Sequence, residues 1–294
     1  MLYVQILING ILLGGLYACI AVGFSLVWGV LNVINILHGS FIVLGAYLAF
    51  FAYTGLGIHP YLFAPFAALV LFMLGYAVQL TVINRVIEAP VLVTLTTTFG
   101  LALLLDNLML VVFAANFRKV SLKPPLGVID LSDTFPSIDL IVPVDRLASM
   151  LFALVFVALL YWLLRHTVVG RAIVAVRMDR YAATLMGVDT TKVFAVTFAL
   201  GAALAGAAGA LLSPIFPISP LAGTTYLGKA FVICVLGGLG SVSGALVGGL
   251  VLGVLESFGA LFFGPEHSLT LSFTVLILLL IFRPNGIMGK RGFV

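Results

Sequence analysis

The first 84 residues of this sequence contain no acidic or basic side chain. The first charged residue is Arg85, and no Asp, Glu, Lys or Arg precedes it. As α-helix, at about 1.5 Å per residue, such a stretch would extend roughly 126 Å, which is about four crossings of a lipid bilayer. A water-soluble domain carries about 25% charged residues, so it does not leave that much surface uncharged. The sequence therefore predicts a polytopic membrane protein.

The composition of the whole chain indicates that helices cross the membrane. Of the 294 residues, 63% are hydrophobic and 8% are charged. In lipid, only α-helices and closed β-barrels satisfy every backbone hydrogen bond. Barrel strands alternate apolar and polar residues, whereas the apolar runs here are continuous and about twenty residues long. We therefore expect an all-α bundle of about eight to ten membrane spans, with residues 1–294 forming a single transmembrane domain.

The expected spans follow the apolar runs. They lie near residues 3–28, 36–53, 61–83, 91–115, 147–164 and 193–212. The stretch 224–282 holds about three more crossings, whose boundaries are blurred by glycine. Because the sequence opens with no basic run and no convincing cleavage site, we interpret residues 3–28 as a retained span and not as a signal peptide.

The distribution of Lys and Arg predicts which loops share a side of the membrane. Residues 165–192 carry Arg165, Arg171, Arg177, Arg180 and Lys192, and the tail adds Arg283, Lys290 and Arg291. By the positive-inside rule both segments are cytoplasmic. Counting crossings backwards places the 116–146 loop outside, the turn at Arg85 inside and the N-terminus outside. Four prolines in the 116–146 loop favour a structured but non-helical connector.

Two segments are expected to interrupt helices inside the bundle, near residues 30–40 and 236–244. The first contains polar side chains between two apolar spans, and the second is a glycine-rich run that is a poor continuous helix. Gly240, Gly244 and Gly248 recur every four residues. On a helix this spacing forms one stripe of small residues, which lets another backbone approach closely.

Polar residues at membrane depth are the candidates for a substrate path. They are Asn32, Asn35, His38 and Ser40 at the first break, and Asp106 within a later span. A helix that starts at a break offers free N–H groups and a positive dipole to a carboxylate, and an intramembrane charge usually faces the bundle interior or a water path. The alternative is structural: a helix cap with packing for the first group, and an interhelical hydrogen bond for Asp106.

Other motifs argue against chemistry within the chain. The segment Gly223–Ala230 nearly fits the phosphate-binding pattern G-x-x-x-x-G-K-[ST], but Ala230 lacks the hydroxyl that would hold Mg²⁺. Its Lys229, like Glu256, lies near a span edge, so we expect both side chains to reach an interface. His38 has no second ligand at metal-binding spacing, and no catalytic set is present. We therefore expect no cofactor, no metal and no enzyme activity in this chain.

The 165–192 loop contains a short helical segment. A helix from about Asp179 to Met186 would end at Gly187, a normal glycine C-cap. It would place Tyr181, Leu185 and Val188 on neighbouring turns, an apolar strip that indicates docking to another protein. The alternative is an ordinary positively charged cytoplasmic loop.

Four segments distributed along the chain carry a family resemblance. Tyr181–Gly187 resembles the "EAA…G" coupling loop of ABC-importer permeases, with Tyr181 where that pattern has Glu. Asn32–Tyr47 and Val235–Ala245 resemble two signatures of the branched-chain amino acid permeases. The tail Arg283–Gly289 resembles their "RPxGLxG" ending. The chain is thus similar to the shorter of the two permease subunits of that family, and the departure at Tyr181 weakens only the coupling-loop match.

The resemblance implies a multi-pass permease subunit of a bacterial inner-membrane ABC importer for branched-chain or related hydrophobic amino acids. The partners it implies are a second permease subunit in a heterodimer, two cytoplasmic ATPases and a periplasmic substrate-binding protein, with no nucleic acid. The residues that would couple to the ATPases are Arg177, Asp179, Arg180, Tyr181, Ala182, Ala183, Leu185 and Gly187.

Two alternative functions remain open at this point. A sister importer for urea, short amides or other amino acids has similar permeases, because substrate choice in such systems lies largely in the binding protein. A secondary transporter driven by an ion gradient is a different class, and it would need paired intramembrane acids as an ion site. Only Asp106 is a candidate for such a site.

Overall fold

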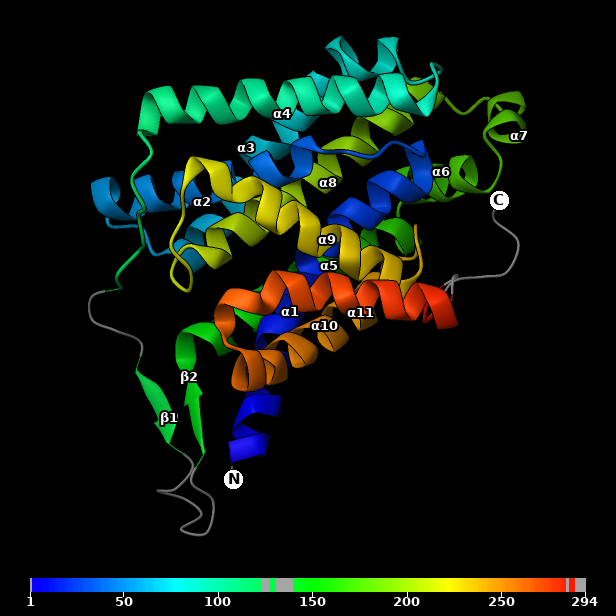
Figure 1. Ribbon diagram of the computed structural model, residues 1–294. Coiled ribbons are helices and arrows are strands. Elements are labelled where there is room, and N and C mark those ends of the chain that lie inside the picture. Colours follow the sequence, from blue (N-terminus) through cyan, green and yellow to red (C-terminus); the bar gives the residue numbers. More distant parts are fainter. Residues whose placement is uncertain (1, 123–126, 131–139, 284–285, 289–294) are drawn as a thin grey trace.

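The computed structural model describes residues 2–122, 127–130, 140–283 and 286–288. Helices dominate these residues, and two short strands pair outside the helical body (Figure 1). The helices are α1 (Leu2–Leu31), α2 (Leu37–Leu56), α3 (Pro60–Thr81), η1 (Ile83–Arg85), α4 (Val91–Phe113), α5 (Val144–His166), α6 (Val168–Met178), α7 (Arg180–Leu185), α8 (Thr190–Leu212), η3 (Pro220–Ala222), α9 (Gly223–Gly237), α10 (Val242–Phe263), η4 (Pro265–His267) and α11 (Ser268–Phe282). The strands are β1 (Val128–Asp130) and β2 (Ile141–Pro143).

The predicted all-α membrane bundle is confirmed. In the described residues, eight helical segments are long and apolar enough to cross a bilayer, and Thr270–Phe282 of α11 forms a shorter apolar helix. The first six expected spans correspond to α1–α5 and α8, and the stretch 224–282 divides into α9, α10 and α11.

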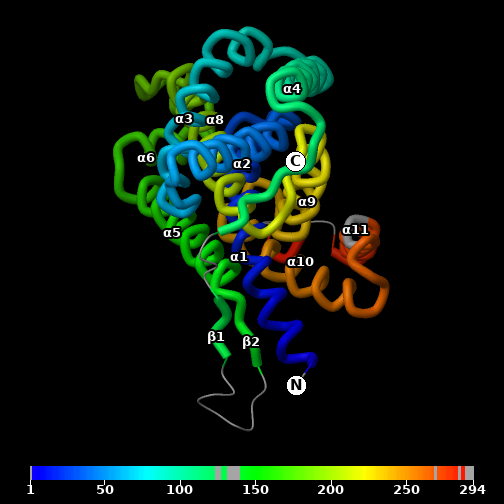
Figure 2. Tube along the Cα trace, turned by 90° about the vertical axis from the view of Figure 1, so that its left-hand side faces the viewer, coloured from blue at the N-terminus to red at the C-terminus, as the bar shows by residue number. Residues whose placement is uncertain are grey.

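Helices α1 and α8 form the centre of the bundle. In their most apolar 18-residue windows, 89% of α1 and 83% of α8 is buried, against 22% of α4 and of α5. Helix α4 accordingly lies along one edge of the molecule and α11 along another, as Figure 2 shows. The apolar outer faces of α3, α4 and α5 suit contact with lipid, because lipid solvates apolar side chains as a protein core does.

Glycines allow the central helices to approach closely. A Cβ atom on Gly14 of α1 would lie 2.7 Å from the Cα atom of Leu250 on α10. On the other side of α1, a Cβ atom on Gly23 would lie 3.0 Å from the carbonyl oxygen of Gly201 on α8. Such contacts replace side-chain packing by backbone packing, which is a common way for helices to associate in membranes.

The loops gather at two opposite ends of the bundle. At one end, here called the α7 end, Arg180 of α7 forms an ion pair with Glu88 of the α3–α4 turn, and α11 finishes on the same side of the molecule, at the right in Figure 1. At the other end, here called the hairpin end, Gln5 of α1 exchanges hydrogen bonds with Ile141 of β2. This grouping matches the relative sidedness that the cation count predicts.

The connection between α5 and the preceding span lies at the hairpin end. Strands β1 and β2 pair antiparallel, with Ile129 opposite Val142. Upstream of them, the Arg118 N–H donates to the Ile218 carbonyl at 2.9 Å and links this connection to the segment between α8 and α9. The expected non-helical connector is thus present in the described part. Lys123, Pro124, Pro125, Asp133, Pro136 and Asp139 lie outside the described residues, as do Lys290 and Arg291 of the tail.

The first expected break lies between α1 and α2. Helix α1 ends at Leu31, and Asn32 adopts a left-handed conformation with φ of +53°. The chain then turns back along the bundle, so that His38 in the first turn of α2 lies 3.0 Å from the carbonyl of Ile20, in the interior of α1. Helix α2 therefore begins inside the bundle and not at its surface.

The second expected break lies between α9 and α10, and it differs from the prediction in one detail. Gly240 precedes α10 and has φ of +76°, so it does not belong to the same stripe as Gly244 and Gly248. The reason is local, because a left-handed residue cannot continue a right-handed helix. Gly240 lies close to α1, because a Cβ atom on Gly29 would lie 2.9 Å from the Cα atom of Gly240. Gly244 and Gly248 lie on α10 against the end of α9.

The free carbonyls at the end of α9 are satisfied by the tail. The N–H groups of Ile287 and Met288 donate to Leu236 and Gly237 at 2.7 and 3.1 Å. A helix end buried in a membrane protein needs such partners, because no water is available to replace them.

Candidate functional site

Lys229 of α9 and Glu256 of α10 form an ion pair in the interior of the bundle. The Lys229 Nζ atom lies 2.6 Å from Glu256 Oε1 and 2.8 Å from the hydroxyl of Tyr17 on α1. The ammonium also lies 4.7 Å from the centre of the Tyr17 ring. Lys229, Glu256 and Tyr17 expose only 7%, 9% and 1% of their surface. These three residues, here called the buried triad, join three helices through charge-assisted hydrogen bonds.

The expectation that Lys229 and Glu256 reach an interface is wrong. A long charged side chain reaches water only where its stem can run along an open helix surface. Helices α1, α9 and α10 pack against one another here, so both side chains point into the bundle and compensate each other. The sequence did contain the signal, namely a cation and an anion in two neighbouring apolar helices.

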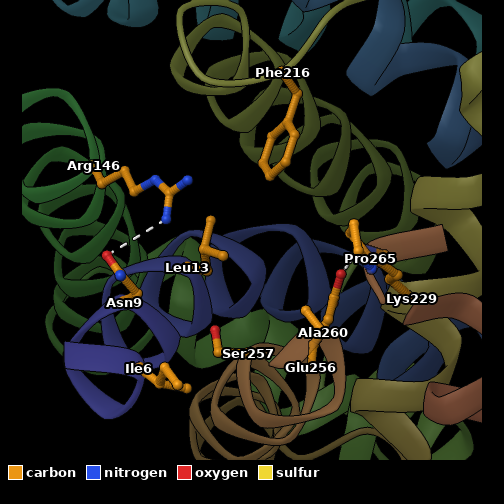
Figure 3. A pocket seen from close by; sticks show the side chains of 10 residues that line it. All are labelled: Ile6, Asn9, Leu13, Arg146, Phe216, Lys229, Glu256, Ser257, Ala260 and Pro265. Carbon is orange, nitrogen blue, oxygen red and sulfur yellow. Dashed lines mark hydrogen bonds and ion pairs between the residues drawn. The ribbon is translucent and has the colours of Figure 1, made fainter. Parts of the chain in front are cut away.

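A cavity of about 370 Å³ lies beside the buried triad at the hairpin end of the bundle. It is lined by Ile6, Asn9 and Leu13 of α1, Arg146 of α5, Phe216, Lys229 of α9, Glu256, Ser257 and Ala260 of α10, and Pro265. Figure 3 shows Arg146 and Asn9 on one side, Glu256 and Lys229 on the other, and Leu13 and Phe216 between them. The walls are therefore charged at opposite sides and apolar in the middle.

Two charged groups of this cavity retain unused hydrogen-bonding capacity. The Arg146 guanidinium lies 3.5 Å from the side-chain oxygen of Asn9, at the limit of a hydrogen bond. The Oε2 atom of Glu256 is buried and has no hydrogen-bond partner among the described residues. Sequence reasoning missed Arg146 and Asn9 as site residues, because Arg146 counted only as a loop cation. Its place in the first turn of an apolar span was the signal available.

The structure separates the five predicted path residues. Asn32 is exposed at the α7 end, where it lines a cavity with Arg177 and Asp179. Asn35, His38 and Ser40 are buried within the bundle. The left-handed turn at Asn32 causes the separation, because it sends the following residues back toward the bundle interior.

The buried members of this group contact protein on several sides. The His38 ring meets Phe24 edge-on at 5.6 Å, and its Nε2 atom contacts the backbone of α1. Ser40 of α2 lies near Asp106 of α4, and the Oδ1 atom of Asp106 has no hydrogen-bond partner among the described residues. The side-chain amide of Asn35 has no hydrogen-bond partner among the described residues, although only 1% of the residue's surface is exposed. For Asp106, the structural alternative and the substrate-path alternative both stay predictions.

The short helix of the 165–192 loop is α7, and both of its ends follow from the sequence. The Asp179 carboxylate accepts a hydrogen bond from the Ala182 N–H at 2.9 Å, which caps the helix start. Gly187 supplies the left-handed residue after the helix, with φ of +83°. Ala183 is buried and turns toward the bundle. The helix therefore stands at the α7 end in a defined orientation.

A side-chain contact fixes α7 against the neighbouring loops. The Arg180 guanidinium lies 2.8 Å from Glu88 and 4.9 Å from the centre of the Phe194 ring. The two side chains of the ion pair are 45% and 79% exposed, so the pair orients α7 more than it stabilises the fold.

An exposed apolar strip covers the outer face of α7. Tyr181, Leu185 and Met186 expose 74%, 71% and 85% of their surface. Val188 packs against the bundle core and does not extend the strip, so that part of the prediction is wrong. The left-handed Gly187 reverses the chain direction and turns Val188 inward. Such a strip at the cationic end indicates a protein-binding surface.

The phosphate-binding look-alike Gly223–Ala230 forms the first two turns of α9. Its Lys229 belongs to the buried triad and so is not presented to solvent. The backbone N–H groups that would cradle a phosphate in a glycine-rich loop are here part of a helix.

The fold and site together define a polytopic helical membrane protein of the transporter class. Helices that begin or end inside the bundle, next to polar side chains, are typical of such proteins. Comparison with known sequences then identifies the family. The chain belongs to the family described as branched-chain amino acid transport system / permease component, whose family model matches residues 6–282.

Several characterised sequences are similar over nearly the whole chain. The high-affinity branched-chain amino acid transport system permease protein BraD of Pseudomonas aeruginosa is 33% identical, with 98% of this chain and 96% of the relative covered. The permease protein LivH of Escherichia coli K12 is 32% identical at the same coverage. The permease protein LivM of Salmonella typhimurium is 28% identical, covering 93% of this chain and 68% of the relative. No solved structure gives a significant match.

Proposed function

We propose that this chain is the membrane-spanning permease subunit of a bacterial ABC importer for branched-chain or related hydrophobic amino acids. The observation that carries the proposal is the exposed apolar strip of α7, held by Arg180 and Glu88 at the cationic end of a bundle of this family. A transporter needs a place where energy enters, and this strip is the surface best suited to receive a partner protein.

The energy for transport would come from two separate ATPase subunits. The only segment that resembles a nucleotide site, Gly223–Ala230, lies within α9 with its lysine buried, so this chain would hold no nucleotide and no other cofactor of its own. Each ATPase would accept an α7 helix in a surface groove. Tyr181 and Leu185 would enter the groove, Ala182 and Ala183 would line its edge, and Arg177, Asp179 and Arg180 would form a polar rim that fixes orientation.

The proposed setting is the bacterial inner membrane. The α7 end, with the cations of residues 165–192 and the C-terminal tail, would face the cytoplasm, and the hairpin end with the N-terminus would face the periplasm. A second permease subunit would complete a heterodimer, as the similarity to two differently named permeases, LivH and LivM, supports. A periplasmic binding protein would deliver the substrate at the hairpin end.

Transport would follow from alternating access. ATP-driven movement of the ATPases would push on α7, and α6 and α8 would transmit the movement into the bundle because they flank α7 in the chain. The breaks at residues 32–36 and 238–241 provide the joints, since irregular backbone inside a bundle has few hydrogen bonds to break. Asn35, His38 and Asp106 are the residues beside the first joint that a passing substrate could meet.

The proposal is tested by measuring what drives leucine uptake by the assembled importer in proteoliposomes. Replacing the nucleotide-binding lysine of the ATPase subunits is expected to reduce leucine uptake to background. Collapse of the proton and sodium gradients by ionophores, at constant ATP, is expected to leave uptake unchanged.

Uptake that follows an ion gradient and survives loss of the ATPase would overturn the proposal in favour of a secondary transporter. Uptake that is ATP-driven but selective for urea or short amides would retain the ABC importer and replace the substrate.

A further inference from the structure

We infer that the cavity beside the buried triad is a binding site for a free amino acid in its zwitterionic form. The carboxylate would bind Arg146, the ammonium would bind Glu256, and the apolar side chain would lie against Leu13 and Phe216. The inference deepens the proposed function and rests on it for the substrate class. It assigns to the permease itself a site that recognises the charged head of the substrate.

The position of the cavity suits an entry site. Its lining comes from the first turns of α1 and α5, the end of α10, and the segment after α8, all at the hairpin end. A ligand there would be separated from the α7 end by the packed centre of the bundle. Lys229 and Glu256 of the buried triad line the cavity on the α9 and α10 side, as Figure 3 shows.

The charges of the cavity and its unpaired acceptor match the two ends of a zwitterion. Arg146, Lys229 and Glu256 give two cations and one carboxylate, so the lining has one uncompensated positive charge. A ligand carboxylate would pair with the Arg146 guanidinium, and a ligand ammonium would pair with Glu256 Oε2, which has no hydrogen-bond partner among the described residues. A zwitterion bound in this way leaves the net charge of the site unchanged. A cation alone would add to the excess positive charge, and an anion alone would leave Oε2 unpaired.

The size and the apolar wall agree with a single amino acid. A cavity of about 370 Å³ lies at the lower end of the range for small-molecule sites and has room for a single amino acid. Leu13 and Phe216 lie between the two charged sides in Figure 3. A branched aliphatic side chain in that position would lose contact with water and gain contact with apolar atoms.

The experiment measures binding of radiolabelled leucine to the purified chain, together with the subunits that copurify with it, in lipid nanodiscs without ATP or soluble binding protein. Two competitors separate the charged ends: 4-methylpentanoate lacks the amino group, and leucinamide lacks the carboxylate. Arg146→Gln is expected to weaken binding of leucine and of 4-methylpentanoate by roughly 10- to 100-fold. Glu256→Gln is expected to weaken leucine similarly and to leave 4-methylpentanoate unchanged.

Matched controls remove a charge of the same sign from a residue at the hairpin end that does not line the cavity. Lys119→Gln and Glu266→Gln alter exposed residues and are expected to leave leucine binding within about twofold. If Glu256→Gln alone fails to fold because Lys229 loses its partner, the double variant Lys229→Met, Glu256→Gln removes the whole buried pair. It is expected to retain 4-methylpentanoate binding and to lose leucine binding.

Equal leucine binding by Arg146→Gln and Lys119→Gln would overturn the inference, as would equal competition by 4-methylpentanoate in the unmodified protein and in Arg146→Gln. Either result, combined with ATP-driven leucine uptake, would leave the proposed function intact. Conversely, Arg146-dependent binding with uptake driven by an ion gradient would support the site and reject the ABC importer.

Discussion

At the scale of single residues, Lys229 and Glu256 form an ion pair that is buried on both sides, unlike the exposed pairs Arg180–Glu88 and Lys192–Asp189. Removing two charges from water is costly, and their attraction offsets that cost only when geometry and additional hydrogen bonds are favourable. Both conditions are met here, because the Nζ–Oε1 distance is 2.6 Å and the Tyr17 hydroxyl contacts both groups. Loss of either partner therefore leaves an uncompensated buried charge.

Lys229→Met is expected to destabilise the protein by about 3–5 kcal/mol, because the carboxylate of Glu256 then stays buried without a counter-ion. The double variant Lys229→Met, Glu256→Gln is expected to recover most of that loss. The measurement is the unfolding temperature of the solubilised protein, which is obtained from the fraction of protein that remains monodisperse after heating. Lys192→Met is the control, since the side chains of Lys192 and Asp189 in its ion pair are 76% and 49% exposed and solvent screens their attraction. A result for Lys229→Met no larger than for Lys192→Met would show that the pair contributes nothing to stability.

At the scale of elements, the contact between α9 and α10 depends on glycine. A Cβ atom on Gly244 would collide with the carbonyl oxygen of Gly237, and one on Gly248 would meet the carbonyl of Ile233. Backbone atoms cannot move aside as the end of a flexible side chain can. The two helices are therefore held at a distance that only a residue without a side chain permits.

Gly244→Leu is expected to prevent normal packing of α9 on α10 and to cost more than the 1–3 kcal/mol usual for overpacking, because the obstruction is backbone. Leu246→Ala on the same helix removes a half-buried side chain and is expected to cost less than the 2–5 kcal/mol of a fully buried leucine. Yield and monodispersity after solubilisation compare the two. Equal tolerance of both changes would mean that the Gly244 stripe is not a close helix contact.

At the scale of the whole molecule, the two ends of the bundle have different chemical character. The α7 end has Arg177, Arg180 and the apolar strip. The hairpin end has the paired strands (Figure 1) and the cavity lined by Arg146. The native cysteines, Cys19 and Cys234, are both buried. Single introduced cysteines therefore report which end faces which compartment.

In intact cells, a membrane-impermeant thiol reagent is expected to label Lys119→Cys at the hairpin end and to spare Tyr181→Cys at the α7 end. In membranes with the assembled importer, Tyr181→Cys is expected to crosslink to an ATPase subunit, because the exposed apolar strip would lie in its groove. The unmodified protein, with both cysteines buried, is the control for background labelling. Labelling of Tyr181→Cys from outside the cell would contradict both the orientation and the coupling mechanism.

The sequence by itself determined the features that depend on one segment at a time. Hydropathy summed over about twenty residues predicts each span, because lipid requires it locally. A left-handed glycine after α7, the Asp179 cap and the breaks before α2 and α10 follow from the conformational preferences of a few neighbouring residues. The distribution of Lys and Arg predicted which loops share an end, since each crossing reverses the chain.

Only the tertiary structure decided which distant side chains meet. The rotation of α9 and α10 about their axes turns Lys229 and Glu256 toward each other, and mean hydropathy is the same for every rotation. The left-handed turn at Asn32 likewise places that residue at the α7 end and His38 in the interior, although only six positions divide them in the sequence. The cavity of Arg146 and Glu256 combines residues from separate helices, so it exists only once those helices are packed. Packing chooses among arrangements that a single segment cannot distinguish, because it depends on contacts between elements far apart in the chain.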